Sequence, residues 1–204
     1  MILNIENTLK IKKNNMKSSI HFKKVIIPLS LFLLTQNTAF AQEIKLAKLD
    51  IFNNRNDLQV YVNLQGAFPD KIKEYILIGL PASISFYITL YKVRDMWIDK
   101  KISDLKITHT INYNALKKEF VIRRSWEIEN LRATKSFIEA QQLMSKVDPI
   151  KLVSLSRLDK DRKYQIRVKA EVSKNTQSSY LPNVHYYSSK WNLETQLYTI
   201  DFIY

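Results

Sequence analysis

Residues 164–172 read YQIRVKAEV, and this stretch gives the clearest indication of the fold. Every second residue from Tyr164 to Val172 is apolar, and every residue between them is polar or charged. Because successive side chains of a β-strand point to opposite faces, this alternation predicts a strand with one buried face and one face in water. One wet face is typical of antiparallel sheets, since parallel sheets are usually covered on both sides. The stretch therefore predicts an antiparallel β protein.

The same alternation recurs along the chain and predicts further strands. They are expected at residues 58–64, 84–90, 105–113 and 120–128, with weaker indications at 44–52 and 151–158 and a last strand at Leu193–Tyr204. About eight strands at this spacing favour a mainly β fold, an antiparallel immunoglobulin-like β-sandwich. A small β-barrel is the alternative.

Two short helices are expected to interrupt the strands. The first opens at Pro69 and closes at Gly79, which is the usual placement of proline and glycine at the two ends of a helix. Gly79 is expected to adopt a positive φ, which glycine reaches at little steric cost. The second begins at Ser136, because Ser136 and Glu139 have the spacing of a capping box, and it is expected to end at Asp148-Pro149.

The first 41 residues have the three parts of a secretory signal peptide. Lysines precede the ten-residue apolar run Val25–Leu34, and the small-residue exit Ala39-Phe40-Ala41 follows it. A transmembrane helix needs about 20 such residues, so this run is too short to be one. We expect export by the general secretion route to the periplasm or the medium, with cleavage after Ala41 and Met16 as the true start. An uncleaved N-terminal anchor is the alternative.

Length, charge and composition narrow the class of protein that residues 42–204 form. They have the length of a single domain, expected to be the β-sandwich. The formal charge of the chain is +13, but six lysines and one glutamate lie in residues 1–41, so residues 42–204 carry +8. An exported protein meets no DNA or RNA, so we expect no nucleic-acid partner. The absence of cysteine excludes a disulfide framework and a thiol nucleophile, and two glycines are too few for a phosphate-binding loop.

Candidate catalytic groups are sparse in residues 42–204. The two histidines are His109, expected on the buried face of its strand as a hydrogen-bonded structural residue, and His185. Two separated histidines do not supply the three or four ligands of a zinc site. Asp95, Asp99 and Asp104 flank a turn, where aspartates are common for reasons of turn chemistry, although a paired-carboxylate glycosidase site is the other interpretation. We expect no enzymatic activity, no metal and no cofactor.

Residues 173–190 form the longest stretch without a regular pattern. Loops longer than about 12–15 residues are usually either functional or disordered. Tyrosine offers a large contact area with a polar tip, so this stretch is a candidate interaction loop. The alternative is a hairpin connection whose tyrosines cover the end of the core. The candidate interaction residues are Tyr180, Leu181, His185, Tyr186 and Tyr187.

Basic residues on the expected strands form a candidate basic face. Arg123, Arg167 and Lys169 would lie on the outer side, near further basic residues such as Arg94 and Arg124. Such a face would attract anionic lipid headgroups, and so contact a membrane surface, or it would attract an acidic envelope polymer. The alternative is a solvated surface that prevents edge-to-edge pairing of sheets.

The stretch Leu64–Asp99 resembles a bacterial family known as domain of unknown function 4390. A strand, a short helix ending in Gly79-Leu-Pro, a long strand and Trp97-Ile-Asp99 follow one another in the family's order. Further matches are HTINYNALKKEFVI from His109, the helical stretch from Phe137 to Leu143, YQIRVKA from Tyr164 and WNLET from Trp191. The resemblance covers about residues 44–204.

The resemblance implies an exported single-domain protein with no catalytic residues to carry over. It also implies a membrane sensor histidine kinase as a partner, because genes of the family often stand beside one. From the residues themselves, Trp97, Trp126 and Trp191 are expected to pack in the core or at its rim. The resulting hypothesis is a non-enzymatic protein-interaction or sensory accessory module of the cell envelope. The alternative is a carrier or sensor of a small apolar or lipidic ligand held between the sheets.

Overall fold

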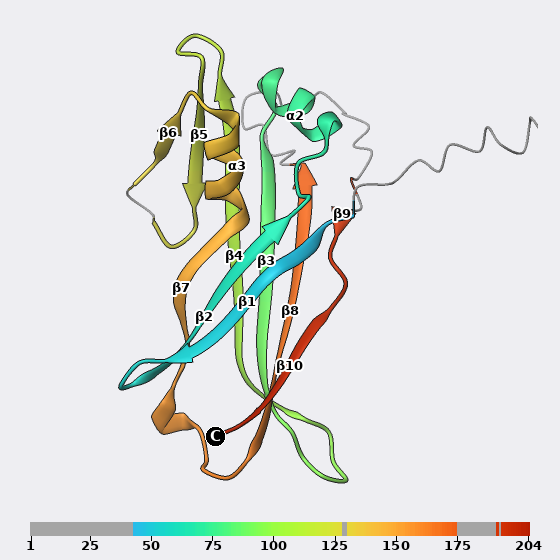
Figure 1. The fold of residues 1–204 in the computed structure, drawn as a ribbon, viewed down its shortest axis with the longest axis vertical. Coiled ribbons are helices and arrows are strands. Elements are labelled where there is room, and N and C mark those ends of the chain that lie inside the picture. The colour runs from blue at the N-terminus through green and yellow to red at the C-terminus, as the bar shows by residue number, and fades with distance from the viewer. Residues whose placement is uncertain (1–42, 128–129, 175–190, 192) are drawn as a thin grey trace, which may run out of the picture. The chain divides into compact units, whose positions relative to one another are not determined.

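The computed structural model describes residues 43–127, 130–174, 191 and 193–204, all within the unit Gln42–Tyr204. The candidate interaction loop at 180–187 and the expected signal peptide lie outside the described residues. The elements, shown in Figure 1, are β1 (Lys45–Asn53), β2 (Asp57–Gln65), α2 (Asp70–Leu77), β3 (Ala82–Lys92), β4 (Lys100–Asn114), β5 (Glu119–Arg124), β6 (Arg132–Thr134), α3 (Phe137–Ser145), β7 (Lys146–Ser154), a 3₁₀ turn (Leu155–Arg157), β8 (Lys163–Lys174), β9 (Leu193–Glu194) and β10 (Tyr198–Ile203).

The strands form two antiparallel sheets. One has the order β1-β2-β7, and the other has the order β10-β8-β3-β4-β5-β6, with β9 paired to β8. In Figure 1 the smaller sheet lies across the larger one, so the expected mainly β sandwich is confirmed. The order β10-β8-β3-β4-β5 is compatible with the G-F-C-C′-C″ order of variable-type immunoglobulin domains. The narrower immunoglobulin-like assignment stays a prediction.

The alternating apolar residues meet between the two sheets and make one core. On β2, β3 and β8 every second side chain is buried, as the sequence pattern predicted. The outer positions of these strands are polar and partly exposed, apart from a few small hydroxyl residues on β3. The fully buried side chains from the larger sheet include Ile84, Phe86, Ile88, Leu90, Tyr164, Ile166 and Val168. Burial of this apolar surface is the main source of stability, since the chain has no disulfide.

Helix α2 ends in a Schellman motif, as the position of Gly79 suggested. Gly79 has φ +87°, and its N–H donates to the carbonyl oxygen of Ile76 at 2.9 Å. The N–H of Leu80 donates to the carbonyl oxygen of Tyr75 at 3.3 Å. These two bonds satisfy carbonyl groups that the end of a helix otherwise leaves unpaired. The expected positive φ is confirmed.

Helix α3 begins where the sequence predicted and ends earlier than expected. The Ser136 hydroxyl accepts from the Glu139 N–H at 3.3 Å, but the Glu139 carboxylate turns to the Thr134 hydroxyl and leaves the capping box half-formed. The helix ends at Ser145, so the expected end at Asp148-Pro149 was wrong. These two residues lie in β7 at a register shift against β2. Proline has no N–H to give to a ladder, and a bulge is one of the few places in a sheet where it fits.

The expected strand over residues 120–128 is also shorter in the structure. β5 ends at Arg124, where the chain turns and the Glu127 N–H donates to the Arg124 carbonyl oxygen at 3.0 Å. The weak indication at 151–158 is the end of β7 followed by the 3₁₀ turn. The expected last strand is divided into β9 and β10. The apolar pattern alone did not reveal these breaks, because turn residues here include Trp126 and Leu155.

Candidate functional site

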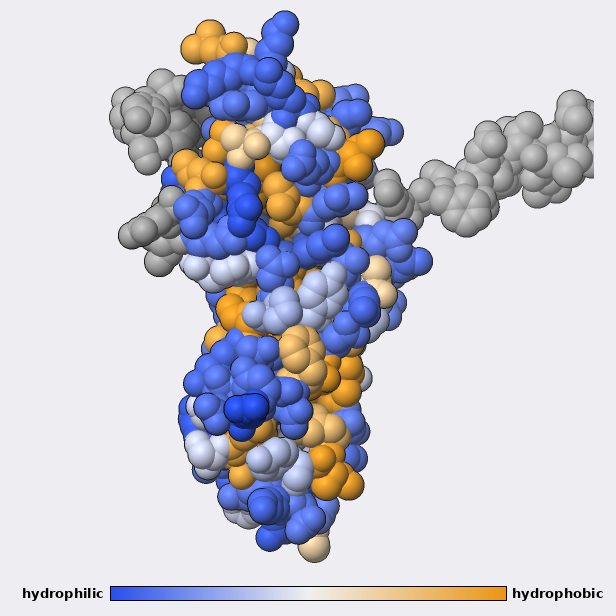
Figure 2. All heavy atoms as spheres, turned by 60° about the vertical axis from the view of Figure 1, so that its left-hand side comes forward, coloured by the Kyte–Doolittle hydropathy of each residue, from blue (hydrophilic) through white to orange (hydrophobic). Residues whose placement is uncertain are grey.

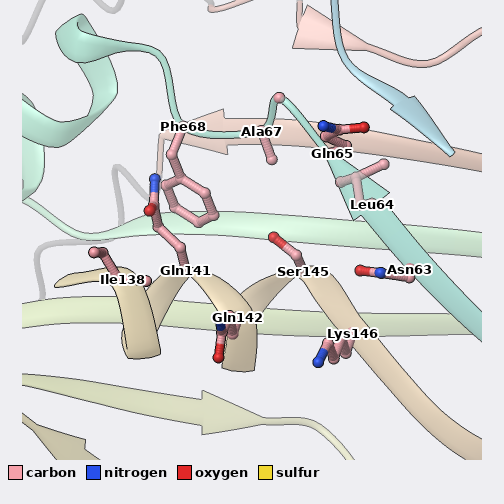
Figure 3. A pocket seen from close by; sticks show the side chains of 11 residues that line it. Asn63, Leu64, Gln65, Ala67, Phe68, Ile138, Gln141, Gln142, Ser145 and Lys146 are labelled. Atoms are coloured by element: carbon pink, nitrogen blue, oxygen red, sulfur yellow. The ribbon is translucent and has the colours of Figure 1, made fainter. Parts of the chain in front are cut away.

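A pocket of about 380 Å³ lies between the end of β2 and helix α3. We call it the amide pocket, because four carboxamide side chains line it: Asn63, Gln65, Gln141 and Gln142. Figure 3 shows the side chains of the strand on one side and those of the helix on the other. The remaining walls are formed by Leu64, Gly66, Ala67, Phe68, Ile138, Ser145 and Lys146.

Local geometry explains why these polar groups meet. Asn63 and Gln65 are two residues apart on a strand and therefore share a face. Gln141 and Ser145 are four residues apart on α3 and lie one turn above each other on its surface. The strand continues into Gly66, whose φ is +80° and whose position a side chain could not occupy, since an added Cβ would lie 2.7 Å from the Glu43 carbonyl oxygen. The turn at Gly66 thus shapes one wall of the pocket.

The polar groups of the amide pocket are uncommitted. Within the described part of the chain, none of the four carboxamides forms a hydrogen bond, and neither do the Ser145 hydroxyl and the Lys146 ammonium. Each carboxamide offers two donors and one acceptor oxygen. The pocket can therefore bind a neutral polar group such as a peptide amide, with one positive charge at its rim. The sequence did not single out these glutamines, because glutamine on the wet face of a helix is ordinary.

His109 lies fully buried beneath α3, as expected for a structural histidine. Its Nδ1–H donates to the Met144 carbonyl oxygen at 2.8 Å, and its ring packs against Phe86 and Trp126. The Nε2 atom has no hydrogen-bond partner among the described residues. Burial lowers the pKa of His109 from 6.5 to about 4, so the ring is neutral at physiological pH. In this environment His109 can hold β4 to α3, whereas proton exchange with a substrate would require solvent access.

Arg124 is buried beside His109 and does not belong to an outer basic face. Its guanidinium forms ion pairs with Glu127 and with Asp148, the latter at 2.8 Å, and it lies 5.0 Å from the Trp126 ring. Two N–H groups of Arg124 reach the two carboxylate oxygens of Glu127. This contact, followed by that of Arg132, lowers the pKa of the Glu127 carboxyl. A pocket of about 370 Å³ opens beside this network, and the two arginines that line it, Arg124 and Arg132, are already paired with carboxylates.

The three residues of the candidate basic face lie on the outer side of the larger sheet, and two of them have acidic partners. Arg167 forms an ion pair with Asp99 at 3.0 Å, and Lys169 forms one with Glu194 at 2.8 Å. Arg123 lies on β5, which is separated from β8 by β3 and β4. The structure therefore places these cations on a surface of mixed charge. Contact between this face and a membrane stays a prediction.

The three aspartates near the β3–β4 turn do not form a carboxylate pair. Asp99 is held by Arg167, and Asp104 accepts from Lys101 at 2.8 Å and from the Thr89 hydroxyl at 3.1 Å. Asp95 is exposed in the turn itself. Among the described residues, no cluster of three or more His, Asp or Glu side chains is suited to hold a metal ion.

The candidate interaction loop lies outside the described residues, but residues that flank it are described. The Lys174 ammonium, at the end of β8, lies 5.3 Å from the Tyr75 ring and 4.9 Å from the Trp191 ring. Tyr75 and Trp191 pack edge to face with their centroids 4.5 Å apart. We call these three residues the aromatic clamp. It confirms the expected packing role of Trp191 at the rim of the core.

The turn between β3 and β4 exposes three consecutive apolar side chains, which we call the hairpin tip. Met96, Trp97 and Ile98 are 101%, 74% and 83% exposed. The expectation that Trp97 packs at the core was therefore wrong, while Trp126 packs as expected. Figure 2 shows mainly hydrophilic atoms, with a run of hydrophobic residues along the right side of its lower half. Single exposed apolar residues are common, but three in a row at the end of a hairpin suggest contact with a partner.

Comparison with known families adds one finding to this geometry. A family model described as "Domain of unknown function (DUF4390)" matches residues 41–201. The chain belongs to this family. The resemblance inferred from the strand, helix and Gly-Leu-Pro pattern is thereby confirmed, and no activity comes with it.

No curated protein and no solved structure matched this DUF4390 chain. In the described part of the DUF4390 chain, neither helix has the length and the apolar character needed to cross a membrane. The amide pocket and the hairpin tip are therefore assessed on their own chemistry.

Proposed function

We propose that this DUF4390 chain is a non-enzymatic protein-interaction module of the cell envelope, and that it recognises its partner with the amide pocket. The single observation that carries the proposal is that four carboxamides from β2 and α3, none of them hydrogen-bonded to another described residue, line one pocket. A partner polypeptide offers backbone N–H and C=O groups, which carboxamides match with both a donor and an acceptor. The exposed side chain of Ile138, which lines the pocket, supplies apolar contact area.

The chemistry of the other candidate groups supports binding rather than catalysis. A general base must reach the proton that it removes, but His109 is enclosed by Phe86, Trp126 and α3. The buried Arg124 is held by two carboxylates, so it is already neutralised. Charged and polar groups that bind one another stabilise the fold. The side chains of the amide pocket that form no hydrogen bond with another described residue remain available to a partner.

Export places the expected partner outside the cytoplasm. The apolar run Val25–Leu34 and the exit at Ala41 motivate this part of the proposal. The partner class that the family resemblance suggests is the extracytoplasmic part of a membrane sensor kinase. A sensory accessory role would then consist of binding that sensor in one of its conformations.

The alternative function, carriage of a lipidic ligand between the sheets, receives less support. The inward side chains of β2, β3 and β8 occupy that space, and each is at most a few per cent exposed. The amide pocket and the pocket beside Arg124 are open to solvent, and polar and apolar side chains both line them. A long acyl chain would have to displace packed residues, and interiors packed to normal density resist this.

Site-specific photocrosslinking in cells tests the proposed function. A photoreactive amino acid replaces the exposed Gln142 in the amide pocket, and a control chain carries it at the exposed Thr199 on β10. We expect one discrete crosslinked envelope protein from position 142, with the yield reduced by a further Gln141→Ala and Ser145→Ala change. Equal crosslinking from both positions, or a yield insensitive to the pocket changes, would contradict the proposal.

A further inference from the structure

The hairpin tip projects beyond the paired part of the larger sheet. The last backbone pair between β3 and β4 joins Lys92 and Lys100, and residues 93–99 extend past it. The base is anchored, because the Val93 N–H donates to the Lys163 carbonyl oxygen at 2.9 Å. Met96 has φ +62°, an uncommon conformation for a residue other than glycine. The turn therefore holds its three apolar side chains in solvent on a firmly attached base.

Positive charge surrounds the hairpin tip. Residues 92–101 together with the adjoining turn 155–163 contain eight basic and four acidic side chains. Within the described residues, five of the basic side chains take part in no ion pair: Arg94, Lys100, Arg157, Lys160 and Arg162. Two of the acidic side chains, Asp95 and Asp161, also form no ion pair with a described residue. An excess of unpaired positive charge thus lies behind the exposed apolar residues.

We propose that the hairpin tip inserts into the headgroup region of a bilayer that contains anionic lipids. Tryptophan prefers the membrane–water interface, since its ring is apolar and its N–H still reaches polar groups. Met96 and Ile98 would enter the boundary of the acyl chains, while Arg94 and Lys100 would contact phosphate groups. Each basic residue near an anionic surface contributes attraction that salt weakens. This membrane contact is separate from the amide pocket, which lies near α2 and α3 at the other end of the sheets (Figure 1).

The shape of the hairpin tip favours a bilayer over a protein as its partner. A stable protein interface buries about 800 Å² on each partner and needs a complementary surface. A single turn with three protruding side chains offers a narrow, convex contact. Lipid headgroups adapt to such a shape, and insertion to a depth of about 5–10 Å is typical of interfacial apolar groups. The adjacent cations complement anionic phosphate groups, which a neutral protein groove would not supply.

Vesicle binding by the protein purified from cells that express the full chain tests this proposal. The probes are phosphatidylglycerol–phosphatidylethanolamine vesicles and neutral phosphatidylcholine vesicles. The tip variant carries Met96→Ser, Trp97→Ser and Ile98→Ser. The matched control is Leu116→Ser in the β4–β5 hairpin, where Leu116 is 97% exposed. Any contribution from the N-terminal segment is the same in all three proteins.

We expect the partition coefficient of the tip variant to anionic vesicles to be at least about tenfold lower. This corresponds to about 1.4 kcal/mol of binding free energy lost with the apolar contacts. The Leu116 control should bind like the unchanged protein. Arg94→Gln with Lys100→Gln should weaken binding to anionic vesicles only, and added salt should have the same effect. The tryptophan emission should shift to shorter wavelength on binding, and Trp97→Phe should abolish that shift.

Three results would overturn the membrane proposal. The first is equal vesicle binding by the unchanged protein and the tip variant. The second is no change in Trp97 emission when the vesicles bind the protein. The third is a tip-dependent crosslink to an envelope protein in the absence of vesicle binding, which would make the tip a protein contact. None of these results bears on crosslinking from Gln142, so the proposed function is tested separately.

Discussion

His109 on β4 donates a hydrogen bond from Nδ1 to the carbonyl oxygen of Met144 in the last turn of α3, at 2.8 Å. The bond fixes the neutral tautomer of the ring and joins the helix to the larger sheet. It also satisfies one of the carbonyl groups that the C-terminal turn of a helix leaves without an intrahelical partner. A single buried imidazole therefore determines where α3 rests on the sheet.

Because of His109, the free energy of unfolding should decrease as the pH is lowered. In the unfolded chain the ring protonates near pH 6.5, whereas in the fold its pKa is about 4. The unfolded state thus binds more protons between these values, and stability decreases as the pH falls from 6.5 to 4. The full effect is about 3 kcal/mol. Urea unfolding at a series of pH values measures it.

The control for this pH dependence is His109→Leu. This variant should be less stable at pH 7, because it leaves the Met144 carbonyl oxygen unpaired, but its stability should change much less between pH 6.5 and 4.5. The carboxyls of Glu127 and Asp104, whose pKa values are lowered by their cationic partners, lose their contribution only below that range. Identical pH slopes in both proteins would show that His109 is not the titrating group.

Arg124 and its neighbour Arg123 should respond differently to the same substitution. Arg124→Met leaves Asp148 without its cation and Glu127 with Arg132 alone, and we expect a loss of about 2–4 kcal/mol, limited by the exposure of Asp148. Arg123→Met changes an exposed residue on the outer face and should cost less than about 0.5 kcal/mol. Chemical denaturation measures both losses. Similar losses from the two substitutions would contradict the ion network described for Arg124.

The two glycines should differ in their tolerance of alanine. Both have positive φ, but at Gly79 an added Cβ meets no atom within 4 Å, whereas at Gly66 it would lie 2.7 Å from the Glu43 carbonyl oxygen. Gly79→Ala should cost about 1 kcal/mol from backbone strain alone. Gly66→Ala should cost at least about 2 kcal/mol, because the end of β2 must also move. Thermal unfolding of the two variants gives the comparison, and a larger loss at Gly79 would refute it.

The protein purified from its own cells should carry no copurifying lipid. The side chains between the sheets are closely packed, so a bound acyl chain would need space that the core does not offer. Native mass spectrometry compares the intact mass with that of the same sample after denaturation. A reproducible ligand that dissociates on denaturation would instead favour the carrier function.

The exported form should begin at Gln42. Recognition of the Ala39-Phe40-Ala41 exit by a signal peptidase would leave residues 42–204. N-terminal sequencing of the protein from the cell envelope checks this expectation. A cytoplasmic protein with Met1 or Met16 intact would contradict export.

Much of the fold could be predicted because alternation marks burial directly. The buried positions of β2, β3 and β8 coincide with the apolar positions of the sequence pattern. The end of α3 could not be predicted in this way. Its apolar spacing continues to Val147, but pairing between Val62 and Val147 draws that residue into β7. Tertiary pairing thus determines a boundary that local spacing leaves open.

The candidate sites were less predictable than the fold. The amide pocket joins Asn63 to Gln141 across more than seventy positions of sequence, and neither residue belongs to a recognisable motif. Trp97 was expected in the core because tryptophan is mostly buried, and no local pattern showed that its turn extends beyond the sheet. The burial and the hydrogen bond of His109 were predicted correctly, since it occupies an apolar position of an alternating strand.

The aromatic clamp gives the DUF4390 domain a tolerant place for evolutionary or engineered insertions. Lys174 and Trp191 are held against each other and against Tyr75, so the chain that joins them starts and finishes at adjacent points. In general, doubling the length of a flexible loop adds only about 0.6 kcal/mol to the entropic cost of holding its ends together. A peptide tag or a foreign recognition sequence placed between these two residues would leave the sandwich folded.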